Sequence, residues 1–246
     1  MSGAAPAVSI VVPARNEAAN LAPLVAEIER AMATVGPFEC VVVDDGSSDG
    51  TAAVVRALAA SRPWLRLLRH ERSCGKSAAV RTAVRRARAP VILTLDADGQ
   101  NDPADLPRLL DALRLGGQRC GLVAAQRIRR NDTGFKRWQS RAANAVRARW
   151  LGDGTRDTNC GLKAFPRQLY LELPFFDGLH RFLPALVRRE GLDVALLDVI
   201  DRPRRSGVSN YGFFDRLWVG IADLFGVHWL IRRAVSRPVV VPEGEA

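Results

Sequence analysis

The sequence predicts an α/β fold, with a mainly parallel central sheet flanked by helices. Three apolar runs of strand character, residues 8–12, 38–43 and 91–95, each stop at a polar segment, and helix-like stretches over 20–34 and 50–60 follow the first two. Strand, loop and helix in repeated order are typical of a parallel sheet covered by helices. Ligands bind at the carboxyl ends of the strands in such sheets. The three polar strand ends therefore indicate one shared site.

The third strand end carries a candidate metal site, because Asp96 and Asp98 follow the apolar run and Gln100 comes two residues later. Side chains at i and i+2 of an extended chain point to the same side. If the chain stays extended, all three offer oxygen ligands to one divalent cation such as Mg²⁺ or Mn²⁺. The alternative is ordinary turn chemistry at Asp98-Gly99, with a helix start at residues 101–103.

The first two strand ends are also polar. The run 8–12 stops at residues 13–17 (PARNE), and the run 38–43 stops at the acidic pair Asp44 and Asp45. Residues 48–49 can cap the following helix, which leaves the acidic pair for binding. The alternative is that the pair only forms a turn with the glycine that follows it.

Residues 74–77 (CGKS) look like the end of a phosphate-binding Walker A loop, but position 70 is His70 where that motif requires glycine. The segment follows a strand-like run at 65–69 and opens a helix predicted over 76–88. A Gly-Lys pair at a helix start can approach phosphate, which makes Lys76 a candidate donor contact. The alternative is a solvent-facing lysine.

The composition fits one cytosolic domain. The 246 residues suit a single α/β domain with a full core, and the N-terminus lacks a basic region followed by an apolar core, so we expect no signal peptide. The four cysteines have no CxxC spacing, and we interpret them as reduced thiols.

The formal net charge is +10 and comes mainly from arginine. A basic chain favours polyanionic partners, namely nucleic acid, anionic lipid head groups or phosphorylated substrates. No nucleic-acid-binding signature is present, and aromatic residues are sparse in the basic stretches, so we expect no nucleic-acid partner.

Residues 213–233 (FFDRLWVGIADLFGVHWLIRR) predict a C-terminal amphipathic helix. Asp215, Arg216 and Asp223 interrupt its apolar run, which is too short to span a membrane. Tryptophan and phenylalanine with terminal arginines suit a helix lying in the membrane interface. The alternative is a helix packed on the domain's own core. We therefore divide the chain into a catalytic domain, 1–212, and an interface helix with a tail, 213–246.

The joint set of motifs resembles a known family. PARNEAANL, VVVDDGSSDGT and LDADGQNDP occur in this order, followed by RDTNCGLKAF (156–165), HRFLPAL (180–186) and RPRRSGVSNYG (202–212). Together they resemble family 2 glycosyltransferases of the GT-A fold, of the dolichyl-phosphate mannose synthase or polyprenyl-phosphate sugar synthase type. The resemblance covers about residues 8–233.

This resemblance implies inverting transfer of a sugar from a nucleotide-sugar donor to an undecaprenyl- or dolichyl-type phosphate, with Mg²⁺ or Mn²⁺ as cofactor. The acceptor phosphate is already ionised, so the reaction needs a cationic cradle and no general base. The interface helix predicted over 213–233 leads us to expect a peripheral protein on the cytoplasmic face of the inner or plasma membrane. A membrane protein that uses the lipid-linked sugar is a further expected partner.

The resemblance assigns site residues by matching positions. The catalytic and metal-binding residues are Asp96 and Asp98, with Gln100 as a further metal ligand. The donor contacts are Pro13, Ala14, Glu17, Asp44, Asp45, Lys76 and Asp96. The acceptor-phosphate contacts are Arg127, Lys136, Ser140 and Arg204. Position 136 has lysine where the family has arginine, which keeps the charge but loses the bidentate fork. Asn210 stands where the family usually has lysine, so phosphate contact there is not expected.

Two alternatives to this function stay open. A family 2 enzyme acting on a hydroxyl acceptor would need a catalytic carboxylate near Asp157 or near residue 180. His180 and Arg181 stand at the second place, and we interpret them as cationic, which favours a phosphate acceptor. The other alternative is a non-catalytic relative that only binds nucleotide, against which the intact Asp96 and Asp98 argue.

Overall fold

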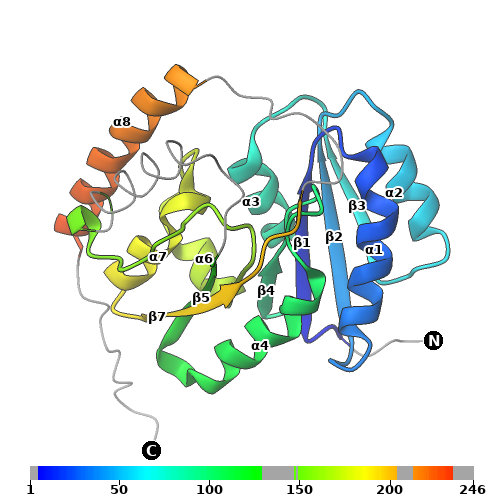
Figure 1. Cartoon of the computed structure of the whole chain (residues 1–246), viewed down its shortest axis with the longest axis horizontal. Helices are drawn as coiled ribbons and strands as arrows, with labels where there is room; N and C mark the ends of the chain where they lie inside the picture. The colour runs from blue at the N-terminus through cyan, green and yellow to red at the C-terminus, as the bar shows by residue number, and fades with distance from the viewer. Residues whose placement is uncertain (1–4, 129–146, 148, 204–212, 235–246) are drawn as a thin grey trace, which may run out of the picture.

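The computed structural model describes residues 5–128, 147, 149–203 and 213–234 (Figure 1). Its strands are β1 (Val8–Ala14), β2 (Phe38–Asp45), β3 (Leu65–His70), β4 (Val91–Thr94), β5 (Cys120–Arg127), β6 (Lys163–Pro166) and β7 (Asp193–Val199). Its α-helices are α1 (Ala18–Met32), α2 (Thr51–Ala59), α3 (Lys76–Arg86), α4 (Leu106–Leu115), α6 (Arg167–Glu172), α7 (Leu179–Arg189) and α8 (Phe213–Arg232). Short 3-10 helices cover Pro103–Asp105 and Gly117–Arg119.

The strands form one seven-stranded sheet in the order β3-β2-β1-β4-β6-β5-β7. β1 runs parallel to its neighbours β2 and β4, β2 runs parallel to β3, and β5 runs parallel to β7. Only β6 runs antiparallel, to both β4 and β5, among the strands that the structure describes. The prediction of a mainly parallel sheet is therefore confirmed.

Helices cover both faces of the sheet, because the central strands are apolar on both sides. Ile10 and Val12 of β1 belong to the core that α1, α2 and α4 cover, whereas Val11 belongs to the core formed with α3, α6 and α7. Alternate residues of a strand point to opposite faces, so an unbroken apolar run such as VSIVV is what a doubly covered strand requires. Figure 1 shows these two helical layers with the sheet between them.

Helix α8 packs on α7 through one face and exposes apolar side chains on another (Figure 1). Val227 is buried, Arg181 pairs with Asp223 at 2.8 Å, and Arg189 Nε donates to the Leu230 carbonyl at 3.0 Å. The alternative that this helix packs on the domain is thus confirmed for one face. Within the described ranges, no helix combines the length and hydropathy needed to cross a bilayer.

Candidate active site

The carboxyl ends of β1, β2 and β4 lie side by side, because β1 pairs with both other strands. The register places Ala14 opposite Asp44, and Pro13 opposite the residue before it. The loops beyond these strands then bind each other. Glu17 N donates to Thr51 Oγ1 at 2.9 Å, and Ala18 N donates to Asp49 Oδ2 at 3.0 Å. The Asp49 side chain thus accepts a backbone N–H at the start of α1, the helix after β1.

Asn16 fixes the loop after β1 in an unusual conformation, with a φ of 56°. Its backbone N donates to Ser47 Oγ and its side-chain oxygen accepts from Ser48 N, both at 2.9 Å. Asparagine tolerates the left-handed region better than most residues, and these two hydrogen bonds hold Asn16 in that conformation. The PARNE and DDGSS motifs therefore form one rigid unit.

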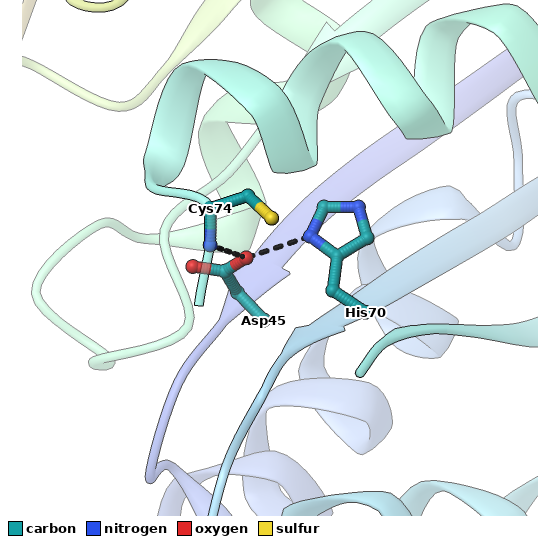
Figure 2. Close-up of side chains that lie close together, drawn as sticks. All are labelled: Asp45, His70 and Cys74. Atoms are coloured by element: carbon teal, nitrogen blue, oxygen red, sulfur yellow. Dashed lines mark hydrogen bonds and ion pairs between the residues drawn. The ribbon is translucent and has the colours of Figure 1, made fainter. Parts of the chain in front are cut away.

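The two carboxylates at the end of β2 are held by their own surroundings. Asp44 is fully buried, accepts from Ser47 N at 2.9 Å and pairs with Arg69 at 3.2 Å. Asp45 accepts four hydrogen bonds from the last residue of β3 and the loop that follows it, as Figure 2 shows in part. These donors are His70 Nδ1 (2.6 Å), Cys74 N (2.8 Å), Ser73 Oγ (2.8 Å) and Gly75 N (2.9 Å).

These bonds decide the charge of Asp45. Burial of the carboxyl favours its protonated form, but the four hydrogen bonds outweigh burial and hold the pKa below the usual range. Asp45 is therefore a carboxylate that organises the segment leading into α3. That Asp45 contacts the nucleotide-sugar donor stays a prediction. A bound nucleotide would contact a carboxylate that also accepts hydrogen bonds from this segment.

Asp96 lies between Lys76 and Gly161. Lys76 Nζ is 2.6 Å from Asp96 Oδ1, which brings the predicted helix-start lysine to the predicted metal ligand. A Cβ added at Gly161 would lie 2.4 Å from Asp96 Cγ. Position 161 must therefore lack a side chain, because the carboxylate occupies that space. Gly161 is held in turn by its carbonyl, which accepts from Thr94 Oγ1 at 2.6 Å.

The chain does not stay extended beyond Asp96. β4 ends at Thr94, and residues 97–99 form a turn. The alternation argument that placed Asp96, Asp98 and Gln100 on one side is therefore wrong, because it assumed an extended chain. Asp98 is nearly buried and accepts from Gln100 N at 3.1 Å, and the Gln100 carbonyl accepts from Arg202 N at 2.8 Å. The turn alternative is confirmed for the backbone, while the ligand roles stay predictions.

Arg127 binds two carboxylates rather than standing alone. Its guanidinium bonds both oxygens of Asp157, at 2.5 and 3.0 Å, and also reaches Asp201 Oδ2 at 3.2 Å. Although burial opposes the charge, these carboxylates raise the pKa of Arg127. Asp201 also accepts from Asn101 at 3.2 Å, which links this clamp to the segment after Gln100. We call Arg127, Asp157 and Asp201 the arginine clamp.

The arginine clamp leads to a stability prediction. Arg127→Met leaves two nearly buried carboxylates without their counter-charge, so we expect a loss of about 3–5 kcal/mol in the free energy of unfolding at pH 7. Burial already raises the pKa of Asp201 beside Arg127. In the variant that pKa rises further, the folded state binds more protons, and stability falls as pH rises through it. Urea unfolding should show the deficit shrinking below about pH 5.

A surface pair provides the matched control for the clamp. Arg119 and Asp193 are 3.3 Å apart, with side chains 79% and 65% exposed. Arg119→Met should cost at most about 1 kcal/mol, with little dependence on pH. Equal losses in the two variants would contradict a clamp role for Arg127.

Lys163 is a buried cation that sequence reasoning missed. It lies in β6 opposite Thr94, and its Nζ donates to the carbonyls of Thr158 and Cys160, at 3.3 and 2.5 Å. Burial, aided by the charge of Lys76, lowers its pKa to about 8. The sequence did contain a signal for this residue, because Lys163 stands among apolar residues in GLKAF. A lysine inside an apolar strand is buried only with polar partners.

His180 is not cationic, contrary to the interpretation from sequence. Its Nδ1 is 2.7 Å from Ser77 Oγ, which also accepts from Gly178 N at 3.0 Å. Burial and the charges of Lys76 and Lys163 hold the pKa of His180 well below the usual range. Lys76, Lys163 and Arg181 are all close to the ring, so a further positive charge on His180 is unfavourable. Arg181 does carry charge at this place, paired with Asp223 of α8.

Three predicted acceptor residues, Lys136, Ser140 and Arg204, lie outside the described residues. The described site therefore brings together the donor and metal candidates at the ends of β1, β2 and β4, with Lys76 beside them. Arg127 lies at the end of β5, bound to its carboxylates.

The mostly parallel seven-stranded sheet flanked by helices is the predicted GT-A fold, and the acidic strand ends and the lysine at the start of α3 lie at the carboxyl edge of its parallel strands. The family model described as Glycosyl transferase family 2 matches residues 9–174. This chain belongs to that family, which confirms the resemblance seen in its motifs.

The chain is also similar to individual members of the family. A dodecaprenyl-phosphate galacturonate synthase of Rhizobium johnstonii is 31% identical over 229 residues, which cover 91% of this chain and 67% of that protein. An undecaprenyl-phosphate 4-deoxy-4-formamido-L-arabinose transferase of Pseudomonas aeruginosa is 32% identical over 83% of this chain and 60% of that protein. The chain thus spans about 60–67% of the length of these relatives.

Solved structures agree on the fold. A mannosyltransferase from Pyrobaculum calidifontis in complex with GDP-mannose and Mn²⁺ superposes with a TM-score of 0.66 at 26% identity, covering 95% of this chain and 66% of that chain. The glucosyl-3-phosphoglycerate synthase from Mycobacterium tuberculosis, with Mn²⁺, UDP-glucose and glycerol 3-phosphate, gives a TM-score of 0.66 at 20% identity, covering 96% and 82%.

Proposed function

We propose that this enzyme transfers a sugar, with inversion at the anomeric carbon, from a nucleotide sugar to the phosphate of a polyprenyl phosphate. The observation that carries the proposal is its similarity to relatives whose names describe this reaction, at 31–32% identity over most of the chain. The product would be a lipid-linked sugar.

A divalent cation, Mg²⁺ or Mn²⁺, fits the end of β4. Asp96 and Asp98 would hold it, with Gln100 as a further ligand, and carboxylate oxygens suit both ions. Lys76 Nζ lies 2.6 Å from Asp96 Oδ1, so a bound ion would displace this lysine from the oxygen or use the other oxygen of the carboxylate. When bound, the ion would neutralise the charge that grows on the leaving diphosphate.

The donor nucleotide would lie over the ends of β1 and β2. Pro13, Ala14, Glu17, Asp44 and Asp45 are the proposed contacts for its base and ribose. Lys76 would approach its phosphates, since it opens α3, where backbone N–H groups favour anions. In this arrangement the sugar would lie between the DADGQ turn and the segment that carries Lys163.

A phosphate acceptor is favoured over a hydroxyl acceptor by the state of Asp157. A hydroxyl acceptor needs a base, and Asp157 is 5% exposed and bound by both arms of Arg127. A carboxylate held in this way is poorly placed to take a proton. An acceptor phosphate would share Arg127 with the clamp, and Lys136, Ser140 and Arg204 stay proposed contacts from sequence.

Helix α8 is the proposed membrane contact of a peripheral enzyme on the cytoplasmic face. Ile221, Phe225 and Trp229 are exposed at a spacing of four residues, so they share one side of the helix. Trp150 packs edge-on against Phe225, with ring centroids 4.8 Å apart, and widens this apolar surface. Arg233 lies over the Trp229 ring at 5.8 Å and would meet anionic head groups. A membrane protein would then consume the product.

The membrane contact leads to a prediction about vesicle binding. The double variant Phe225→Ser, Trp229→Ser should lose most of its binding to vesicles containing anionic lipid, because interfacial affinity scales with buried apolar area. Co-sedimentation measures the bound fraction. The variant should stay folded, since both side chains are more than half exposed.

Leu115→Ser supplies the matched control, because Leu115 is an 88% exposed apolar residue of α4. It should bind vesicles like the wild type. A folded double variant that still sediments with vesicles would remove α8 as the docking surface.

Transfer assays test the proposed function directly. The purified full chain is incubated with Mn²⁺ or Mg²⁺, radiolabelled UDP- and GDP-sugars, and undecaprenyl or dolichyl phosphate in vesicles. We expect label to move into the lipid fraction with at least one donor. Transfer only to glycan hydroxyls would favour the alternative acceptor, and donor binding without any transfer would favour the non-catalytic alternative.

A further inference from the structure

Three side chains of metal-ligating type converge where β2 and β3 end and the following loop leads into α3. Asp45, His70 and Cys74 each offer one ligand atom, and these atoms lie within 4.8 Å of one another. Figure 2 shows the thiol and the imidazole on the same side of the Asp45 carboxylate. The proposed function uses Asp45 alone of the three.

Two of the three side chains already have the outer hydrogen bonds typical of metal ligands. Asp45 Oδ2 accepts from Ser73 Oγ and Gly75 N, at 2.8 and 2.9 Å, while Oδ1 accepts from Cys74 N at 2.8 Å and faces His70 Nδ1 at 2.6 Å. His70 Nε2 lies 2.9 Å from Thr82 Oγ1 of α3, which leaves Nδ1 toward Asp45. Such outer partners fix the orientation of carboxylate and imidazole ligands.

The third ligand is accessible. Cys74 is the exposed cysteine of the chain, whereas Cys40, Cys120 and Cys160 are buried. Its Sγ makes a weak contact of 3.4 Å with the Arg72 carbonyl, which a metal bond would replace at little cost. Solvent at this side can supply a fourth ligand, as in open zinc sites.

The ligand types select the metal. An imidazole, a thiolate and one carboxylate suit Zn²⁺, whereas Mg²⁺ and Mn²⁺ prefer oxygen ligands. Zinc bonds of about 2.0–2.3 Å place tetrahedral ligand atoms roughly 3.3–3.6 Å apart. The His70–Asp45 pair, now at 2.6 Å, must therefore open slightly, and the thiol must close in.

We propose that Asp45, His70 and Cys74 form a zinc site at the start of α3, separate from the magnesium or manganese site at Asp96 and Asp98. On binding, zinc replaces the hydrogen bond between His70 Nδ1 and Asp45 Oδ1. The ring proton then resides on Nε2 and is donated to Thr82 Oγ1, and the thiol releases its proton to solvent. Affinity therefore falls as pH is lowered.

Zinc at this site has a consequence that rests on the proposed function. Asp45 is a proposed contact for the base of the donor nucleotide, and zinc would occupy Oδ1 of its carboxylate. Donor nucleotide and zinc should then exclude each other. Micromolar zinc would inhibit transfer in a way that excess Mg²⁺ does not reverse.

The experiment titrates the full chain with Co²⁺, a spectroscopic substitute for zinc, and with Zn²⁺ by calorimetry. The wild type should show the absorption band of a cobalt–thiolate bond and release about one proton. Cys74→Ser should abolish the band and weaken zinc binding by more than the 10–100-fold typical of an outer partner. His70→Gln should weaken it similarly.

Glu71→Gln is the matched control, because Glu71 is an exposed carboxylate in the same loop. It should bind both metals as the wild type does. A wild type without the thiolate band, or a Cys74→Ser variant with unchanged zinc affinity, would overturn the site. Zinc binding that leaves UDP and GDP binding unaffected would keep the metal site and remove Asp45 from the proposed donor contacts, so the two inferences fail separately.

Discussion

Asp98→Asn should lower the rate of sugar transfer by roughly 10²–10³-fold, the loss typical when a group that stabilises developing charge is removed. The substitution takes away a carboxylate charge at the proposed metal site. It should leave the fold intact, because the asparagine oxygen can still accept the bond from Gln100 N, which is 3.1 Å long in the native turn. Steady-state rates with saturating Mn²⁺ and unfolding curves measure the two effects.

Asp111→Asn controls for loss of a carboxylate in general. Asp111 lies in α4 and is 66% exposed, with a weak pairing to Arg114 at 3.7 Å. Its replacement should leave the rate unchanged. Full activity of Asp98→Asn, or of the wild type in excess chelator, would remove the metal role from this end of β4.

Sequence patterns locate the site because the strand ends are local features. Apolar runs such as VSIVV and FECVVV form strands wherever both faces are covered, and their carboxyl ends meet once the sheet is parallel. Asp44, Asp45 and Asp96 follow directly from this rule. Lys76 follows from the helix start, and its 2.6 Å contact with Asp96 joins two predictions made separately.

Of the two interpretations of the segment after β4, the turn is confirmed and the extended chain is not. Side-chain alternation holds only while the backbone stays extended, and Asp98-Gly99 is a strong turn signal. The Gly99 φ of 74° agrees with that signal. The two interpretations differ in whether the chain is still extended at Asp98. Side-chain alternation alone does not show where the hydrogen bonds of the strand end.

Ion pairs between residues far apart in the sequence could not be predicted from local motifs. Arg127 and Asp157 are 30 residues apart, and Arg127 and Asp201 are 74 residues apart. Their contact depends on β5 lying next to β7, an order that no local motif encodes. The same holds for His180, whose pKa is lowered first by burial and then by the charges of Lys76 and Lys163, which lie in other elements.

Helix α8 shows why two interpretations of one pattern can both hold. Its apolar residues surround more than one side of the helix, so one part packs on α7 and another part faces outward. Val227 is 1% exposed, whereas Trp229, two residues on, is 59% exposed. Apolar periodicity predicts that one side of a helix is buried, but it does not tell whether the protein's own core or another surface covers that side.

Gly161→Ala should reduce the transfer rate about as strongly as loss of the Asp96 carboxylate itself. The added methyl would lie 2.4–2.6 Å from the three carboxyl atoms of Asp96, well inside normal contact. Neither partner yields easily, because Thr94 Oγ1 donates to the Gly161 carbonyl at 2.6 Å and Leu95 N donates to the Val11 carbonyl at 3.1 Å. The short Asp96 side chain must therefore rotate away from Lys76 and from the proposed ion.

The expected signature of Gly161→Ala is a rate at least about a hundredfold lower, weaker Mn²⁺-dependent binding of nucleoside diphosphate by calorimetry, and a stability loss of about 1–3 kcal/mol from overpacking. Gly220→Ala is the matched control, since no described atom lies within 4 Å of a Cβ at that position in α8. It should keep full activity and gain up to about 1 kcal/mol, because alanine favours a helix over glycine. Wild-type activity and metal dependence in Gly161→Ala would show that the reaction does not require Asp96 in its observed position.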